Sequence, residues 1–300
     1  MGYPRRGFTE LPMSLGDRLI ALLESTDAQQ RLRSDPIRFV HRYRDDPRDA
    51  EVAAVFASQL AYGRVDLFGH VLEDLFGRMD AVGGPVSFVH GRPSAKVLAG
   101  LNYRWNRPAD FAGMAAALSE VLRLHGSLER AFQAPDARQS IQRGVGALRD
   151  AAVATAPIWL GRPTPYSDLP RGLRYWLSTP SGGSACKRWN LFLRWMARPA
   201  TDGVDLGQWR SPAPDRLVMP LDTHVHRLAR FLGLTQRKTG NWKTAMEVTE
   251  AMRMLDPEDP VRFDFALAHL GISRDCRGGR VPVVCAACPL DRLCTAESLS

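Results

Sequence analysis

The chain has 300 residues, of which 45% are hydrophobic and 24% are charged, as is ordinary for a soluble globular protein with one large or two closely associated domains. The opening MGYPRRGFTELPMS lacks the apolar segment of a signal peptide, and no later run has the length of a membrane span. We therefore expect a cytoplasmic protein with no membrane partner. The net charge of +8 is compatible with a polyanionic partner, and only four of the basic residues are lysines, Lys96, Lys187, Lys238 and Lys243.

Apolar residues recur with helical rather than strand periodicity along the whole chain, which predicts an all-α protein. Gln59 is a polar residue inside an almost wholly apolar run, and on the sequence alone it is a core glutamine that caps a neighbouring helix. Residues 156–180 are a proline-rich connector, and residues 199–219 have the composition of a loop insertion. The predicted helices cover residues 15–23, 36–43, 50–62, 64–78, a segment after Pro85, 94–98, 109–124, 127–133, 137–154, 184–197, 223–231, 242–255 and 261–271.

A glycine-bearing turn, PSGGSACK, precedes the predicted helix at 184–197. Gly182, Gly183 and Ser184 could expose backbone N–H groups to an anion such as a DNA phosphate. The alternative is a simple helix-initiating turn that is capped by Ser184. Both interpretations remain open from these residues.

Asp222 stands at the N-cap position of the helix in MPLDTHVHRLARFLGL, and Gly233 marks its end. The carboxylate could serve only as a cap. It could also be a working group, because a helix N-terminus keeps an acid ionised and fixed in direction. His224 and His226 are two residues apart, on different helix faces, so we interpret them as structural or DNA-flanking and not as metal ligands.

Four of the five cysteines lie in the last 25 residues, as Cys276-x8-Cys285-x2-Cys288-x5-Cys294. Four thiolates at short spacing are typical of a metal-ligand set. Two disulfides are the alternative, although cytosolic thiols are normally reduced. A single CxxC between two longer arms favours a [4Fe–4S] cluster over zinc, which usually has two CxxC pairs.

Three stretches together resemble the helix-hairpin-helix DNA glycosylases, the superfamily of endonuclease III and the adenine glycosylase MutY. LDTHVHRLARFLGL is similar to the segment with the catalytic aspartate of that family. The cysteine loop is similar to its cluster loop, with gaps of eight, two and five residues here against six, two and five. VFASQLAYGRVD is similar to the LLSAQATD helix, whose glutamine enters the gap left by a flipped base. The resemblance covers roughly residues 48–295 and extends to a bacterial sub-branch with PLDTHV and GSACKR signatures.

The resemblance implies a two-lobed helix-hairpin-helix architecture with a C-terminal iron–sulfur loop. It implies an N-terminal segment, 1–47, that packs on the cluster lobe, a helical barrel lobe at 48–180, and a lobe at 181–300 with the hairpin, the aspartate and the cluster. The hairpin departs from the family pattern close to LPGVGRKTA. Here its counterpart is PSGGSACKRWN, and Lys187 precedes Asp222 by 35 positions, whereas the family has about eighteen; the loop at 199–219 could absorb the difference.

By this resemblance the protein is a monomeric base-excision repair glycosylase of the nucleoid, which acts on double-stranded DNA with a damaged or modified base. Asp222 would be catalytic, and Lys187 would be the nucleophile if the enzyme is also an AP lyase. Gln59, Gly182, Gly183, Ser184 and Arg188 would contact DNA. Cys276, Cys285, Cys288 and Cys294 would hold a [4Fe–4S] cluster, or else zinc, in a loop whose Arg274, Arg277, Arg280 and Arg292 face phosphates. Two alternatives stay open, a non-catalytic DNA-binding protein of the same fold and a zinc-stabilised interaction module.

Overall fold

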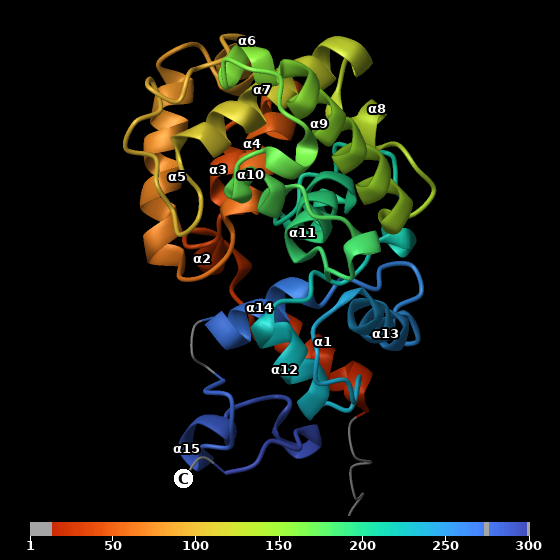
Figure 1. Ribbon diagram of the computed structural model, residues 1–300. Helices are drawn as coiled ribbons and strands as arrows, with labels where there is room; N and C mark the ends of the chain where they lie inside the picture. The colour runs from red at the N-terminus through yellow and green to blue at the C-terminus, as the bar shows by residue number, and fades with distance from the viewer. Residues whose placement is uncertain (1–13, 273–275, 299–300) are drawn as a thin grey trace, which may run out of the picture.

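The computed structural model describes residues 14–272 and 276–298, and these residues form helices and loops without a strand. The all-α prediction is confirmed. Figure 1 shows the helices in two lobes, one above the other. No described helix is both long enough and apolar enough to cross a membrane.

The upper lobe is built around α4, which is buried along almost its whole length because its sequence is apolar on every side. Asp46 caps the helix by accepting from the N–H groups of Arg48 and Asp49, and Pro47 occupies the first turn. Helices α3, α6 and α11 pack on α4, and α7 packs along α9. The helices of this lobe are α2 Ala28–Leu32, α3 Ile37–His41, α4 Pro47–Leu60, α5 Val65–Asp80, α6 Pro85–His90, α7 Pro108–His125, α8 Leu128–Phe132, α9 Ala137–Trp159, α10 Arg171–Trp176 and α11 Lys187–Ala197.

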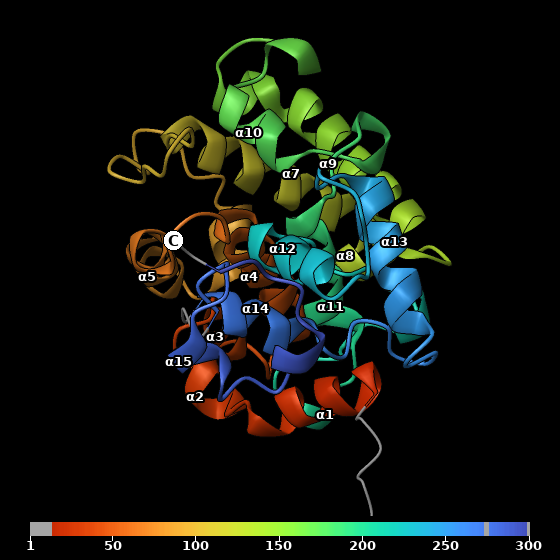
Figure 2. The same cartoon turned by 90° about the horizontal axis from the view of Figure 1, so that it is seen from below.

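In the lower lobe, α12 and α14 lie side by side with α1 and α13 on either side (Figure 2). The two helices approach closely at Gly271, where an added Cβ would lie 2.5 Å from Cβ of His224. The helices of this lobe are α1 Leu15–Ser25, α12 Thr223–Phe231, α13 Trp242–Arg253, α14 Asp264–Ile272 and α15 Pro282–Cys285; the short 3-10 turns of the chain are η1 Tyr166–Asp168, η2 Pro180–Gly182, η3 Ala200–Asp202, η4 Pro214–Arg216 and η5 Asp291–Leu293.

Most predicted helices exist, although several differ in extent, and α10 lies within the predicted proline-rich connector at 156–180. Residues 94–98 form turns and not a helix. Helix α9 continues five residues beyond the predicted end, to Trp159, and the hairpin helix α11 starts at Lys187 and not at Ser184. Helix α11, which follows the predicted lobe boundary at residue 181, packs on α4 and α9 of the upper lobe.

The predicted loop insertion at 199–219 has no α-helix, but several of its side chains are buried. Val204, Asp205 and Trp209 are each at most 5% exposed. The Trp209 ring packs at 5.1 Å from the ring of Phe192, and its indole N–H donates to Glu51 Oε1 at 2.9 Å. The composition indicated a surface loop because it counts prolines and glycines, whereas the apolar residues between them fill the core.

The insertion is fixed by a buried ion cluster around Arg194 of α11. Its guanidinium, 3% exposed, donates to Asp205 of the insertion at 3.1 Å and to Asp264 at the start of α14. Arg198, one turn later, also binds Asp205, at 2.9 Å. The cluster thus joins the upper lobe to the lower one through charges that are almost fully buried.

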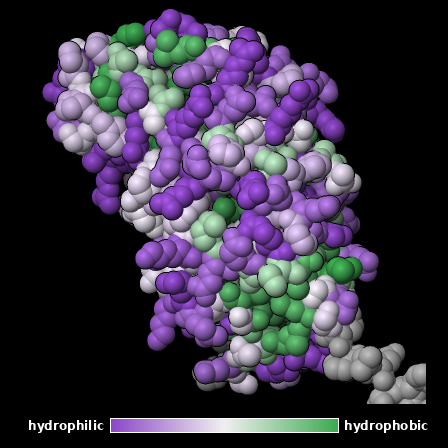
Figure 3. Space-filling model, turned by 90° about the vertical axis from the view of Figure 1, so that its right-hand side faces the viewer, coloured by the Kyte–Doolittle hydropathy of each residue, from purple (hydrophilic) through white to green (hydrophobic). Residues whose placement is uncertain are grey.

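The surface view in Figure 3 shows a largely hydrophilic face with an apolar area on the lower lobe. Exposed apolar side chains of that lobe include Ile20 of α1 and Met254 and Leu255 at the end of α13. The apolar area lies away from the charged residues of the interior that join the lobes.

We expect Arg194→Met to lower the free energy of unfolding by about 3–5 kcal/mol, because the variant leaves Asp205 and Asp264 buried with fewer partners. The measurement is urea unfolding followed by circular dichroism. Arg237→Met, which breaks the exposed pair with Glu247, is the matched control and should cost less than about 1 kcal/mol. Equal losses in the two variants would contradict a structural role for the buried cluster.

Candidate functional site

A cleft of about 930 Å³ opens where the two lobes meet. Its walls come from the end of α4 and the bend after it, the first turns of α11 and α12, and helix α14. The polar residues of the lining that matter below are those with charged, phenol or imidazole side chains. They are Asp35, Tyr62, Arg64, Asp66, Arg104, Tyr175, Lys187, Arg188, Arg194, Asp222, His224, His226, Asp264 and His269.

Asp222 lines this cleft and caps α12, as the sequence predicted. Its Oδ1 accepts from the backbone N–H groups of His224 at 2.9 Å and Val225 at 2.8 Å. Its Oδ2 has no hydrogen-bond partner among the described residues. One oxygen therefore fixes the carboxylate, and the other remains available to a ligand in the cleft.

Lys187 is the first residue of α11 and lines the same cleft. Its ammonium group donates to the carbonyl oxygen of Ala61, at the C-terminal end of α4, at 3.0 Å. No carboxylate forms an ion pair with it within the described part of the chain. The amine thus lies in the cleft, held by one neutral acceptor.

Asp264 connects the two predicted catalytic residues electrostatically. Burial raises the pKa of Asp264 to about 6, although the guanidinium of Arg194 acts in the opposite direction; Asp222 raises the pKa further and Lys187 lowers it. Oδ1 of Asp264 is buried and has no hydrogen-bond partner among the described residues. Asp222, Lys187 and Asp264 therefore form one interacting group in the cleft.

Sequence reasoning missed Asp264. The signal was an acidic residue at the start of DFALAHLGI, an otherwise apolar helix, where a lone carboxylate needs a partner. The same reasoning applies to Asp35 and His269, whose side chains pair at 3.1 Å on another part of the cleft wall. Neither the pair of Asp264 with Arg194 nor the pair of Asp35 with His269 can be predicted from local spacing, because the partners are far apart in the sequence.

The glycine turn differs from the prediction. The N–H groups of Gly182 and Gly183 donate within the turn, to the carbonyl oxygens of Thr179 and Pro180, so they are not free to bind a phosphate. Ser184 does not cap α11, because its hydroxyl accepts from the N–H of Cys186, which is itself the N-cap residue. None of the three predicted contacts lines the cleft.

Gln59 also differs from the prediction, since its side chain is fully buried and does not line the cleft. The next residues along the chain, from Ala61 to Arg64, line the cleft instead. The alternative of a core glutamine fits the burial, although Oε1 has no described hydrogen-bond partner.

Arg188 lines the cleft but is only 8% exposed. It donates to the carbonyl oxygens of Gln59 at 3.1 Å and Tyr175 at 2.7 Å, and it lies 4.0 Å from the centre of the Tyr175 ring. Burial lowers its pKa. The Arg188 guanidinium therefore connects α4, α10 and α11. This buried position differs from the exposed phosphate contact that the resemblance implies.

The four C-terminal cysteines are all free, and they lie near one another. Burial raises the pKa of the Cys288 thiol, and the charges of the other three cysteines add to this effect. Among the described residues, no three His, Cys, Asp or Glu side chains gather closely enough for a single ion. The four thiols match a four-iron cluster in number and chemistry, because each iron of such a cluster binds one cysteine sulfur.

Several hydrogen bonds of the described residues attach the cysteine loop to the rest of the lower lobe, among them the bond from the Cys276 N–H to the carbonyl oxygen of Leu270 at 2.8 Å. Arg18 of α1 donates to the carbonyl oxygen of Pro289 at 2.7 Å, and the Thr295 N–H donates to the carbonyl oxygen of Phe231 at 2.9 Å, where α12 ends. Of the four loop arginines, Arg274 lies outside the described residues. Arg280 pairs with Asp291 at 3.0 Å, and Arg277 and Arg292 are exposed.

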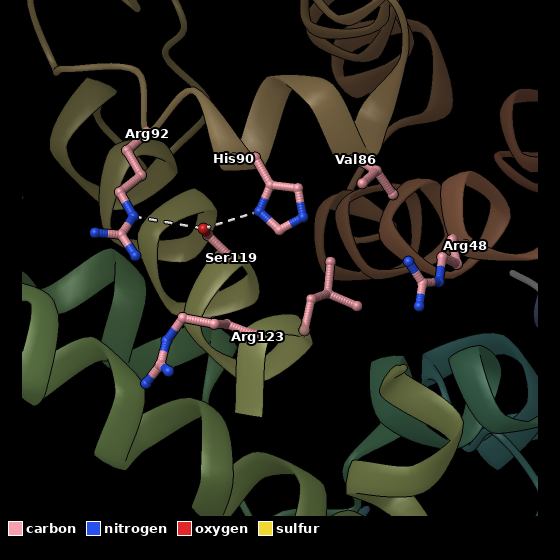
Figure 4. A pocket seen from close by; sticks show the side chains of 7 residues that line it. Arg48, Val86, His90, Arg92, Ser119 and Arg123 are labelled. Atoms are coloured by element: carbon pink, nitrogen blue, oxygen red, sulfur yellow. Dashed lines mark hydrogen bonds between the residues drawn. The ribbon is translucent and has the colours of Figure 1, made fainter. Parts of the chain in front are cut away.

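A second hollow, of about 270 Å³, lies in the upper lobe and is shown in Figure 4. His90 and Arg92 both approach the hydroxyl of Ser119, at 3.2 and 3.4 Å, and Arg123 lies beside them. Glu120 pairs with Arg92 and with Arg123, so two of the positive charges are already neutralised. This hollow contains none of the predicted functional residues.

Comparison with known proteins gives one match. The family model described as "Protein of unknown function (DUF2400)" matches residues 35–273. Searches of curated proteins and of solved structures find no match. The matched range includes every residue discussed for the cleft and ends before the cysteine loop.

We expect Asp264 to make stability depend on pH. Because its pKa is about 6 in the folded protein against 3.8 for an ordinary aspartate, the folded state binds the proton more tightly. Its contribution to stability is therefore present below pH 3.8 and is lost as the pH rises through about 6. Urea unfolding of the wild type and Asp264→Asn, across this range, should show the stability of the wild type relative to the variant decreasing with pH. An increase would contradict the assignment.

Proposed function

The chain belongs to the DUF2400 family, and on that premise we propose, from the cleft itself, that it is a DNA N-glycosylase that removes a damaged or modified base. The observation that carries the proposal is that Asp222 and Lys187, 35 positions apart in the sequence, line one cleft between two helical lobes. Two lobes with a cleft between them also suit the helix-hairpin-helix glycosylase architecture, in which DNA crosses the cleft.

The substrate must leave the duplex before it can react. An N-glycosidic bond inside stacked DNA is out of reach, so the damaged nucleotide would rotate out of the helix into the cleft. The chain has a net charge of +8, and the cleft has three cations without a carboxylate partner among the described residues, Arg104, Lys187 and Arg188. These charges favour the approach of a polyanion.

Asp222 would act on the sugar as the base departs. C1′ becomes positively charged when the glycosidic bond breaks, and a fixed carboxylate next to it stabilises that charge or activates the attacking water. The two backbone N–H groups on Oδ1 keep the carboxylate oriented before the substrate binds. The unpartnered Oδ2 is the oxygen that would face C1′.

Lys187 would make the enzyme bifunctional. When its amine is neutral, Nζ can attack C1′; the Nζ–C1′ bond forms, and the electron pair of the glycosidic bond leaves with the base. Nitrogen then loses a proton and the C1′–O4′ bond opens; O4′ takes its electron pair and a proton, and the C=N bond of a Schiff base forms at C1′. This Schiff base leads to strand cleavage. Without this attack, the nucleophile is water and the product is an abasic site.

The cysteine loop would have a structural task. Cys276, Cys285, Cys288 and Cys294 would hold a [4Fe–4S] cluster, whose contribution when bound is to fix the fold of this loop. The exposed Arg277 and Arg292 would then contact the DNA backbone. In this scheme the loop adds salt-sensitive affinity and takes no part in bond cleavage.

We expect Asp222→Asn to reduce base removal by about 100-fold or more, because it removes the charge at C1′. Asparagine is also a good N-cap, so α12 should remain folded. The assay incubates the protein with duplexes that carry assorted lesions and measures abasic sites. Asp150→Asn, at an exposed aspartate of α9, is the control and should act as the wild type does. Tight DNA binding without base release from any lesion would favour a non-catalytic DNA-binding protein.

Borohydride trapping tests Lys187. Reduction should convert the Schiff base to a stable protein–DNA adduct, visible as a shifted band in denaturing electrophoresis. Lys187→Ala should abolish the adduct, while Lys243→Ala, which removes an exposed lysine of α13, should leave it unchanged. Adduct formation by Lys187→Ala would assign the nucleophile to another amine. Base release without any adduct would indicate a monofunctional enzyme.

We expect protein purified without oxygen to be brown, with absorbance at about 400 nm from the cluster. Cys288→Ser should lose most of this absorbance, and Cys186→Ser should retain it, because Cys186 is buried in the hairpin turn and apart from the loop. If the purified protein is colourless and contains one zinc ion, the four cysteines form a zinc site and not a cluster site.

A further inference from the structure

Two aromatic side chains are exposed side by side at the edge of the cleft. Of the large hydrophobic residues exposed in the described part of the chain, only Trp105 and Tyr175 are aromatic, at 47% and 39% exposure. Their rings contact one another, with centroids 6.4 Å apart and planes at 72°. Exposed aromatic rings that gather at one place are typical of a binding surface.

A third ring continues this surface into the cleft. Tyr62, in the bend after α4, lies 5.4 Å from Tyr175. Both tyrosines line the cleft that contains Asp222 and Lys187. The hydroxyl of Tyr62 donates to Asn106 Oδ1 at 2.6 Å, and Asn106 follows Trp105 in a turn closed by backbone hydrogen bonds with Tyr103. The three rings are thus held in place before any ligand binds.

Arginines lie against each of these rings. Arg171 lies 5.3 Å from the ring centre of Trp105, Arg188 lies 4.0 Å from that of Tyr175, and Arg104 lies 5.9 Å from that of Tyr62. None of the three forms an ion pair with a carboxylate of the described chain. Their positive charges are therefore not neutralised by the protein itself.

We propose that Trp105, Tyr175 and Tyr62, with the exposed Arg104 and Arg171, form a stacking surface for unpaired nucleobases, and that the buried Arg188 supports the Tyr175 ring from the protein side. A ring binds the flat face of any base, and an arginine beside it both stacks and attracts the adjoining phosphate. The charge selects a polyanion, and the rings distinguish an unpaired strand, whose bases are accessible, from an intact duplex. This inference rests on the proposed function, because it takes DNA as the ligand. The surface would hold the unpaired nucleotides that are adjacent to the reacting nucleotide.

The test is fluorescence anisotropy with two labelled single strands of equal length, one of thymidine nucleotides and one with the same backbone but no bases. Trp105→Ala should bind the thymidine strand roughly 5- to 100-fold more weakly, the range expected for one stacked base, and should bind the base-free strand as the wild type does. Trp105→Phe keeps a ring and should recover most of the affinity.

A control variant and the choice of strands separate the outcomes. Arg138→Ala removes an exposed arginine of α9 outside the cleft. It should change the affinity for each of the two strands by no more than a small, salt-dependent amount. Both strands are undamaged and their binding is measured without base removal, so failure of stacking is distinguishable from failure of the proposed glycosylase activity. The proposal is overturned if Trp105→Ala binds the thymidine strand like the wild type, or if it weakens both strands equally.

Discussion

The buried guanidinium of Arg194 fixes the geometry on which the site depends. Arg194 belongs to α11 of the upper lobe, and it binds Asp205 of the segment 199–219 and Asp264 at the start of α14 in the lower lobe. An ion in the interior is tolerated only when it is paired, so these three segments have to meet for the chain to fold. Once they meet, Lys187 at the start of α11 and Asp264 at the start of α14 necessarily lie across the same cleft. The cluster that joins the lobes is thus also what defines the distance between them.

Features encoded by local chemistry were predictable from the sequence. The helical period gave the all-α class, and an aspartate before an amphipathic helix gave Asp222 as the N-cap, because capping involves residues two or three positions apart. The end of α7 at Gly126, with its positive φ of 81°, follows from the same kind of short-range rule. The resemblance to a known family, in turn, brought Lys187 and Asp222 together before any coordinates did.

Features that depend on long-range pairing could not be predicted. The burial of Gln59, the engagement of Arg188 with backbone carbonyls, and the packing of the insertion all depend on segments far away in the sequence. Composition misled at 199–219, since proline and glycine favour turns but do not say whether the turns face water. The internal hydrogen bonds of the glycine turn were likewise invisible, because they depend on the turn geometry and not on the residue types.

Helix α12 has Asp222 at one end and receives the Thr295 N–H at the other, on the carbonyl oxygen of Phe231. Its nine residues span about 14 Å, and a helix of that length behaves as a short rigid rod. The cysteine-bearing segment and the acid of the cleft therefore have one common support, the nine-residue helix that lies between them.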